Sequence, residues 1–287
     1  MITIKAFFVK EADKLNILKH IFNVIDIHNN ELIMQPLKDN LKQRKINRIT
    51  RKIVKICKKK NVASIVLSKR LKSNQELVNE IIENNIHVFN GRWLFNYMAY
   101  DAVEYILQQN GRKKEKTEIS ILTNNLTHPS IETIKMLVKE YKRVNVVTNN
   151  IDKFKYLENK IYNEYGIMIT VTNNKRKSLQ KSEIILNFDF SKELLNKYNI
   201  YDEAIIINIQ GNMKITKKRF NGLNLNDYEI WSTKAYDYFE IGKINDFDLK
   251  DLLEAELYRR DSFYNIRQDI VKGHFKIKNL SWKHVTV

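Results

Sequence analysis

Three segments of this chain end an apolar run in Thr-Asn-Asn: ISILTNN at 119–125, VNVVTNN at 144–150 and IMITVTNN at 167–174. Successive Thr residues of these segments are 25 and 24 residues apart, and a helix-like pattern fills the first gap. Short β-branched runs separated by helical patterns are typical of parallel strands joined by crossover helices. In such sheets ligands bind outside the carboxyl ends of the strands. The Thr-Asn-Asn loops therefore mark the edge where we expect a site.

Two more apolar runs, EIILNF at 183–188 and AIIINI at 204–209, bring the predicted strands to five. Five strands with helices between them predict an α/β protein with a Rossmann-like, doubly wound parallel sheet. Shorter strand-like runs before them, including 62–67 and 86–89, predict a smaller α/β domain that precedes the sheet.

A domain boundary is expected after Asn110-Gly111, because this pair suits a helix C-cap and a charged connector, RKKEK, follows it. We therefore expect an N-terminal α/β domain over 1–111 and a Rossmann-like domain over 112–230. A C-terminal helical segment over 231–287 is expected to return to the first domain. Its main element is predicted to be one long helix over 247–268.

The chain has 287 residues, a formal net charge of +17 and a pI near 9.6. Such a charge attracts phosphate-rich partners, although the abundance of Ile, Lys and Asn also indicates codon bias from an AT-rich genome. Cys57 is the single cysteine, so an intrachain disulfide is excluded, and no Cys/His cluster has the spacing of a metal site. No apolar run reaches membrane-spanning length. We expect a cytoplasmic protein without a metal or integral membrane association.

The segment 41–60 predicts a sharply amphipathic helix, with Ile46, Ile49, Ile53 and Cys57 on one face. Its other face carries Lys and Arg without any acidic residue. This pattern indicates either a solvated basic face or an anion-binding face. The candidate polyanion-binding residues are Arg44, Lys45, Arg48, Arg51, Lys52 and Lys55.

A second basic segment lies in the tail, where cations alternate with aromatic residues that stack on bases in nucleic-acid-binding proteins. The same aromatic residues also suit the buried face of a terminal helix. The cations are Arg259, Arg260, Arg267, Lys272, Lys276, Lys278 and Lys283, and the aromatic residues are Tyr258, Phe263, Tyr264, Phe275 and Trp282.

The order of elements resembles that of two-domain dehydrogenases of the shikimate and methylene-tetrahydrofolate type. In this resemblance 119–123 corresponds to the first cofactor strand and 144–150 to the strand that ends in the ribose-recognition loop. The run 183–188 is similar to the family's "ADIVINAT" strand, and 204–209 to the strand before the nicotinamide-side loop, here Gln210-Gly211. The resemblance implies a substrate domain, then an NAD(P)-binding domain, then helices that return to the first domain.

The sequence departs from that family where the cofactor would bind. TNNLTHPS at 123–130 replaces the glycine-rich turn, whose glycines let the backbone approach a pyrophosphate. Asn149 and Asn150 stand where an NAD enzyme carries an acid for the ribose, and Lys153 lies just beyond. The family's catalytic Lys and Asp have no counterpart, because Lys69 and Asp101 lack the surrounding motif. The candidate ligand-binding residues are Thr123, Asn124, Asn125, Thr127, Ser130, Asn149, Asn150, Lys153, Asn173, Asn174, Gln210 and Gly211.

Three hypotheses follow for the function. The first is a degenerate Rossmann-like protein that serves as a non-catalytic binding, scaffolding or regulatory module and needs no cofactor. The second is an NAD(P)-dependent oxidoreductase with a glycine-free nucleotide loop. The third is a nucleic-acid or polyanion-binding protein. The partner would be another protein or an anionic molecule, and the sequence leaves a homodimer open. Whether polar side chains fill the cleft at the strand ends distinguishes the first two hypotheses.

Overall fold

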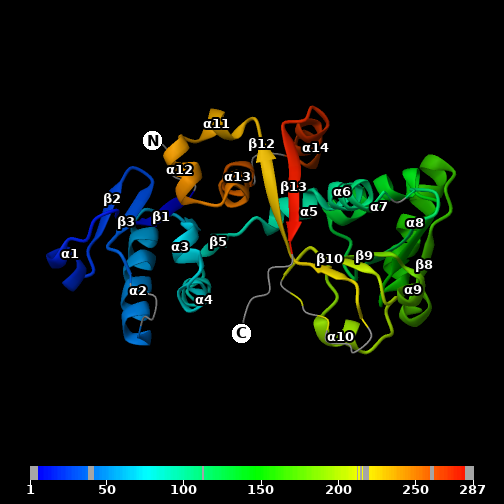
Figure 1. Ribbon diagram of the computed structural model, residues 1–287, viewed down its shortest axis with the longest axis horizontal. Coiled ribbons are helices and arrows are strands. Elements are labelled where there is room, and N and C mark those ends of the chain that lie inside the picture. Colours follow the sequence, from blue (N-terminus) through cyan, green and yellow to red (C-terminus); the bar gives the residue numbers. More distant parts are fainter. Residues whose placement is uncertain are drawn as a thin grey trace. The chain divides into compact units, whose positions relative to one another are not determined.

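The computed structural model describes residues 6–37, 42–111, 113–211, 213, 215, 220–258 and 262–281 (Figure 1). Contacts between residues divide the chain into two compact units. Unit 1 comprises Met1–Gly91 and Thr233–Arg260, and unit 2 comprises Arg92–Ser232 and Asp261–Val287. Each unit contains its own largely parallel sheet, and each is described by itself below.

The main sheet of unit 2 has six strands in the order β11-β10-β9-β6-β7-β8, and the neighbouring strands pair in parallel. Numbered along the chain, this is the 3-2-1-4-5-6 order of dinucleotide-binding folds. The order reverses between β6 and β9, which is the topological switch point of the sheet. The strands are β6 (Glu118–Leu122), β7 (Arg143–Val147), β8 (Thr170–Thr172), β9 (Ile184–Asn187), β10 (Ile205–Asn208) and β11 (Leu223–Leu225).

Strands β9 and β10 are buried along their whole length, as the continuous apolar runs predicted. The doubly wound sheet is thereby confirmed. The predicted strand over 167–172 begins only at Thr170, and β11 was not predicted because Asn224 interrupts its short apolar run. The helices of this part are α7 (His128–Glu140), α8 (Ile151–Tyr165), α9 (Lys175–Lys181) and α10 (Lys192–Asn196).

The helix predicted over 92–109 forms as two helices, α5 (Arg92–Tyr97) and α6 (Ala99–Asn110), which meet at Met98. Helix α6 buries Ala102, Val103 and Leu107, and it contacts α7 and β9 of unit 2. The contact division therefore ends unit 1 at Gly91, whereas the sequence placed the boundary after Gly111. Gly111 is the left-handed C-cap of α6, as the Asn-Gly pair predicted.

The sheet of unit 1 has the order β2-β3-β1-β4-β5, with a parallel core and β2 as an antiparallel edge. This arrangement confirms the smaller α/β domain. The strands are β1 (Phe7–Glu11), β2 (Ile25–His28), β3 (Glu31–Met34), β4 (Ser64–Leu67) and β5 (His87–Phe89). The helices from this part of the chain are α1 (Ile17–Ile21), α2 (Gln43–Lys59), α3 (Lys69–Lys72) and α4 (Gln75–Glu83).

The C-terminal segment returns to unit 1 through α11 (Ala235–Tyr238), α12 (Ile241–Asp246) and α13 (Leu249–Leu257), as expected. The single helix predicted over 247–268 is wrong, however. Helix α13 ends at Leu257, followed by Tyr258 in a non-helical conformation, and Ser262 caps a separate helix, α14 (Phe263–Val271). Helix α14 belongs to unit 2, together with β13 (Phe275–Ser281), which pairs antiparallel with β12 (Asp227–Ser232).

Candidate functional site

The carboxylate of Asp189 accepts hydrogen bonds from the backbone amides of the first Thr-Asn-Asn loop. Asp189 follows β9, and it accepts hydrogen bonds from the N–H groups of Asn124 (N to Oδ1 2.8 Å) and Asn125 (N to Oδ2 2.9 Å). The side-chain amide of Asn125 donates to the same oxygen at 3.0 Å. Strands β6 and β9 are neighbours in the sheet, so Asp189 bridges the two loops at the switch point.

In dinucleotide-binding folds, the loop after the first strand and the following helix N-terminus hold the pyrophosphate at this position. Here the amide hydrogens of Asn124 and Asn125 are already paired with an anionic group of the protein itself. A bound pyrophosphate would compete with the Asp189 carboxylate for the same donors and would be repelled by its charge. The residues present therefore do not fit a dinucleotide in this arrangement.

The N-terminus of α7, which follows the same loop, is capped by side chains of its own first residues. Thr127 and Ser130 form a capping box, in which each hydroxyl accepts the backbone N–H of the other residue (Oγ to N 3.3 and 3.0 Å). Thr127 and Ser130 were predicted as ligand-binding residues, and the structure places both hydroxyls in this local network. Two of the N–H groups that an anion could approach at this helix end are thereby engaged.

Asparagine side chains tie the second Thr-Asn-Asn loop to the first. The Asn124 side-chain oxygen accepts the N–H of Asn149 at 2.8 Å, and the Asn150 side-chain amide donates to the Asn124 carbonyl at 3.1 Å. Asn150 is the N-cap residue of α8, yet its side chain makes no capping hydrogen bond. Thr123, Asn124, Asn125, Asn149 and Asn150 thus form one cross-linked cluster at the ends of β6 and β7.

The third loop repeats the local geometry without joining this cluster. The Thr172 hydroxyl accepts the N–H of Asn174 at 3.0 Å, just as Thr148 accepts that of Asn150 at the same distance. Asn174 then caps α9 by accepting the N–H of Lys177, and the Asn173 carbonyl accepts from the Lys175 ammonium. In the second and third loops the motif is therefore a hydroxyl turn that leads into a helix.

A pocket of about 250 Å³ lies beside Asp189 at the ends of β9 and β10. Gln210 and Gly211, both predicted ligand-binding residues, line it together with Asp189 and two buried asparagines, Asn187 and Asn208. Lys153, another of the candidate ligand-binding residues, is exposed in the first turn of α8.

The sequence did not single out the asparagines beside this pocket. The Asn187 amide donates to the Asn208 side chain at 3.1 Å, and the Asn208 amide donates to the Asn226 side chain at 2.9 Å. Asn187 and Asn208 are 3% and 1% exposed, so they satisfy each other's polar groups within the protein. One signal was available, because Asn187 and Asp189 interrupt an apolar run at the predicted end of a strand.

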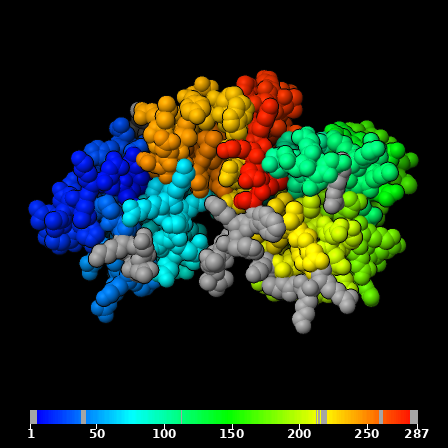
Figure 2. Space-filling model, viewed as in Figure 1, coloured from blue at the N-terminus to red at the C-terminus, as the bar shows by residue number. Residues whose placement is uncertain are grey.

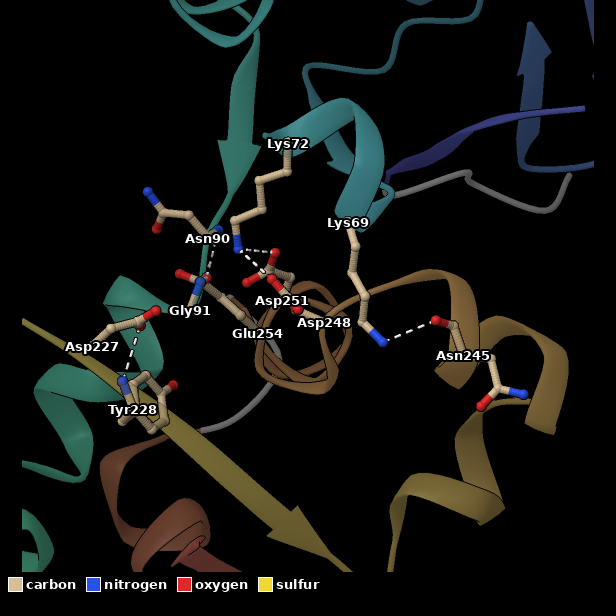
Figure 3. A network of polar contacts seen from close by, with 10 residues as sticks. All are labelled: Lys69, Lys72, Asn90, Gly91, Asp227, Tyr228, Asn245, Asp248, Asp251 and Glu254. Atoms are coloured by element: carbon tan, nitrogen blue, oxygen red, sulfur yellow. Dashed lines mark hydrogen bonds and ion pairs between the residues drawn. The ribbon is translucent and has the colours of Figure 1, made fainter. Parts of the chain in front are cut away.

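A second carboxylate closes the corresponding edge of the unit 1 sheet, at the end of β5 (Figure 3). Glu254 of α13 is 1% exposed and accepts the backbone N–H groups of Asn90 (3.1 Å) and Gly91. Beside it, the Lys72 ammonium contacts Asp248 at 2.9 Å and the fully buried Asp251 at 2.5 Å. Burial raises the pKa of Asp251 to about 6, against the opposing attraction of Lys72.

The two residues compared with a dehydrogenase catalytic pair have separate partners. Lys69 donates to the Asn245 carbonyl at 2.8 Å within unit 1 (Figure 3). Asp101 forms an ion pair with Arg267 of α14 within unit 2, and burial raises the pKa of Asp101 to about 6. Each residue thus contributes to a contact that holds a C-terminal element in place.

The basic residues of α2 divide into two groups. Lys52 donates to the Phe22 carbonyl at 2.6 Å, and the Lys45 ammonium lies 3.2 Å from Nε2 of His20. The second group is exposed and, among the residues that the structure describes, forms no ion pair. This basic row consists of Arg44, Arg48, Arg51 and Lys55, which are spaced as neighbours on the helix face opposite the buried isoleucines.

The aromatic residues predicted for the tail mostly follow the simpler interpretation. Phe263 and Phe275 are 8% and 0% exposed, so they form part of the core, whereas Tyr264 is exposed. Arg267 is engaged with Asp101. Arg259, Arg260, Trp282 and Lys283 lie outside the described residues.

No protein-family model and no curated protein matches this chain. Solved structures match at low identity. A dipicolinate synthase chain from Bacillus halodurans is 11% identical over 69% of this chain and 65% of that chain, with a TM-score of 0.40. L-tryptophan dehydrogenase from Nostoc punctiforme is 8% identical over 95% and 81%, with a TM-score of 0.36. Δ1-pyrroline-2-carboxylate reductase from Thermococcus litoralis, solved with NADH and L-proline, is 12% identical over 42% and 40%, with a TM-score of 0.29.

This chain therefore spans less than two thirds of two of those three proteins. Carbamoyltransferases are also among the matches. The TM-scores are too low for an inference about activity. Within the described ranges, no group of three His, Cys, Asp or Glu side chains is placed to hold a metal ion. No helix in those ranges is long and apolar enough to cross a membrane.

Proposed function

We propose that this protein is a non-catalytic binding module, in which a Rossmann-like unit keeps its fold but uses its nucleotide crevice for internal contacts. The observation that carries the proposal is the Asp189 carboxylate on the amides of Asn124 and Asn125. Hydrogen bonds to a charged group contribute about 1.5–3 kcal/mol each. A dinucleotide would have to displace such bonds before its own phosphates gained a partner.

The alternative of an NAD(P)-dependent oxidoreductase requires Asp189 to leave this position when the cofactor binds. The capped N-terminus of α7 and the Asn124–Asn149 link would also have to rearrange. Lys153 remains available for a 2′-phosphate in that alternative, because it is exposed near the ends of β6 and β7. The two proposals therefore differ in whether the folded protein gains stability from a dinucleotide.

Thermal unfolding in the presence of NAD⁺, NADH, NADP⁺ or NADPH tests the proposal directly. A ligand that binds only the folded state raises the Tm, by linkage of about 2.7 kcal/mol at a hundredfold excess over Kd. We expect no shift with any of the four at millimolar concentration. A concentration-dependent rise in Tm, together with stoichiometric cofactor in native mass spectrometry, would favour the oxidoreductase instead.

A second function is supported by a separate observation, the basic row of α2. Four exposed cations without an acidic partner among the described residues repel one another, and polyanionic phosphate relieves that repulsion. We propose that this row binds a polyanion. Fluorescence anisotropy with labelled duplex DNA at increasing salt measures the binding, whose affinity should fall steeply with salt. Weak, salt-independent signals would contradict it.

A further inference from the structure

Helix α1 and its flanks expose an unusual amount of apolar surface. Leu15, Ile17, Leu18, Ile21 and Phe22 are 57–69% exposed, and α1 buries none of its residues. We call these five side chains the apolar segment. Single exposed hydrophobic residues are common, but a contiguous group of this size marks an interaction site. In Figure 2 the dark-blue start of the chain, which includes α1, forms an outer edge of unit 1.

The apolar segment adjoins the basic face of α2. Lys52 donates to the carbonyl groups of Phe22 and Asn23 at 2.6 and 2.9 Å, and Lys45 lies beside His20. On the helix surface Lys45 and Lys52 flank the basic row, because Arg48 is three residues from one and four from the other. Exposed apolar side chains and uncompensated cations therefore share one continuous surface of unit 1.

We propose that this surface docks unit 1 on an anionic lipid bilayer. The apolar segment would enter the boundary between headgroups and acyl chains, while the basic row contacts the lipid phosphates. Peripheral membrane binding combines these two terms, namely apolar burial and attraction to anionic lipid. The inference deepens the proposed polyanion-binding function of α2 and rests on it.

Other occupants match only half of this surface. Nucleic acid neutralises the basic row but offers no apolar phase for Ile17, Leu18 and Phe22. A second copy docked through the same face would cover the apolar segment, but it would bring two basic rows together and repel. An anionic bilayer complements both the charge and the hydrophobicity, so it is the occupant that the surface fits best.

Sedimentation with vesicles tests the proposal on the full chain. Vesicles of phosphatidylcholine alone are compared with vesicles that also contain phosphatidylserine, and labelled duplex DNA is measured in parallel. We expect binding to the vesicles that contain phosphatidylserine and no binding to vesicles of phosphatidylcholine alone. The double variant L18S/I21S and the triple variant R48Q/R51Q/K55Q should each weaken that binding roughly tenfold or more.

Matched controls lie in unit 2, where Val271 is 78% exposed and Lys177 is exposed on α9. V271S and K177Q should bind the vesicles like the unchanged protein. All the changed side chains are exposed, so circular dichroism and Tm should confirm that each variant folds.

The outcomes separate the two proposals. Binding to DNA without binding to vesicles would overturn the bilayer inference and leave the polyanion-binding function standing. Loss of vesicle affinity in R48Q/R51Q/K55Q but not in L18S/I21S would also overturn it, because the apolar segment would then have no role. Binding to neither DNA nor vesicles would end both proposals.

Discussion

Asp189 and Glu254 make the same kind of hydrogen-bonded contact at the edges of two different sheets. Each is an acidic side chain that accepts two successive backbone N–H groups, Asn124 and Asn125 in one case and Asn90 and Gly91 in the other. These amides lie at the carboxyl ends of parallel strands, where related folds bind anionic ligands. In both units a carboxylate of the protein takes the place that an anionic ligand would have. The paired amides therefore form a structural contact within the unit.

Removing the Asp189 carboxylate should recreate an anion site. Asp189→Ala leaves the Asn124 and Asn125 amides without their acceptor, and we expect the free energy of unfolding to fall by about 1–3 kcal/mol. Inorganic phosphate at millimolar concentration should then raise the Tm of the variant but not that of the unchanged protein. Urea unfolding and thermal scans measure the two effects. Equal responses of both proteins to phosphate would show that Asp189 does not hold an anion position.

The buried carboxyl group of Asp251 should make stability depend on pH. Burial raises its folded-state pKa from 3.8 to about 6, so between these values the folded protein binds a proton that the unfolded chain does not. The free energy of unfolding should therefore fall as pH rises from 4 through 6, by up to about 3 kcal/mol from this group. Urea titrations across that range should show the fall, and Asp251→Asn should reduce it. A rise in stability over the same range in both proteins would contradict the assignment.

At the scale of elements, the sequence correctly predicted the strands that consist of continuous apolar runs. Strands β6, β7, β9 and β10 formed close to the predicted bounds, and Cys57 packs fully buried on the isoleucine face of α2. Periodicity failed where the helical spacing of apolar residues continued across a break in the chain. Leu249, Leu252 and Phe263 keep that spacing, yet Tyr258 and Ser262 separate α13 from α14. The capping serine was the local signal that the pattern concealed.

The sequence predicted where the candidate site lies, but it did not predict which side chains interact there. Thr123, Asn124 and Asn125 lie at the carboxyl edge of the sheet, as the sequence predicted, because they form the loop that follows β6. Their partner Asp189 is 64 residues away from Asn125 along the chain, so only the pairing of β6 with β9 brings them together. Among the described residues, the asparagines with a left-handed backbone are Asn23, Asn29, Asn61 and Asn85, and the second and third Thr-Asn-Asn loops use hydroxyl turns.

At the scale of the whole molecule, each unit is completed by a segment from far along the chain. Residues 233–260 belong to unit 1 and 261–287 to unit 2, so neither unit is continuous in sequence. In unit 1 the completing helix is α13, and its contacts include Lys72–Asp251 and the Glu254 acceptor of Asn90. The integrity of unit 1 should therefore depend on how closely α13 packs against the end of β5.

Gly91 tests that dependence, because a matched control exists in Gly111. Both glycines adopt a left-handed conformation, with φ of +78° and +59°, so alanine is strained at either position. A Cβ at position 91 would also lie 2.8 Å from Cγ of Lys250 on α13, whereas one at 111 would meet nothing within 4 Å. We expect Gly111→Ala to cost about 1–2 kcal/mol from backbone strain alone. Gly91→Ala should cost roughly 1–3 kcal/mol more, as the closely packed α13 is pushed away.

Hydrogen exchange should locate the difference, with faster exchange of the α13 amides in Gly91→Ala and unchanged exchange there in Gly111→Ala. Equal losses of stability and equal protection of α13 in the two variants would show that the return of the tail does not depend on this contact.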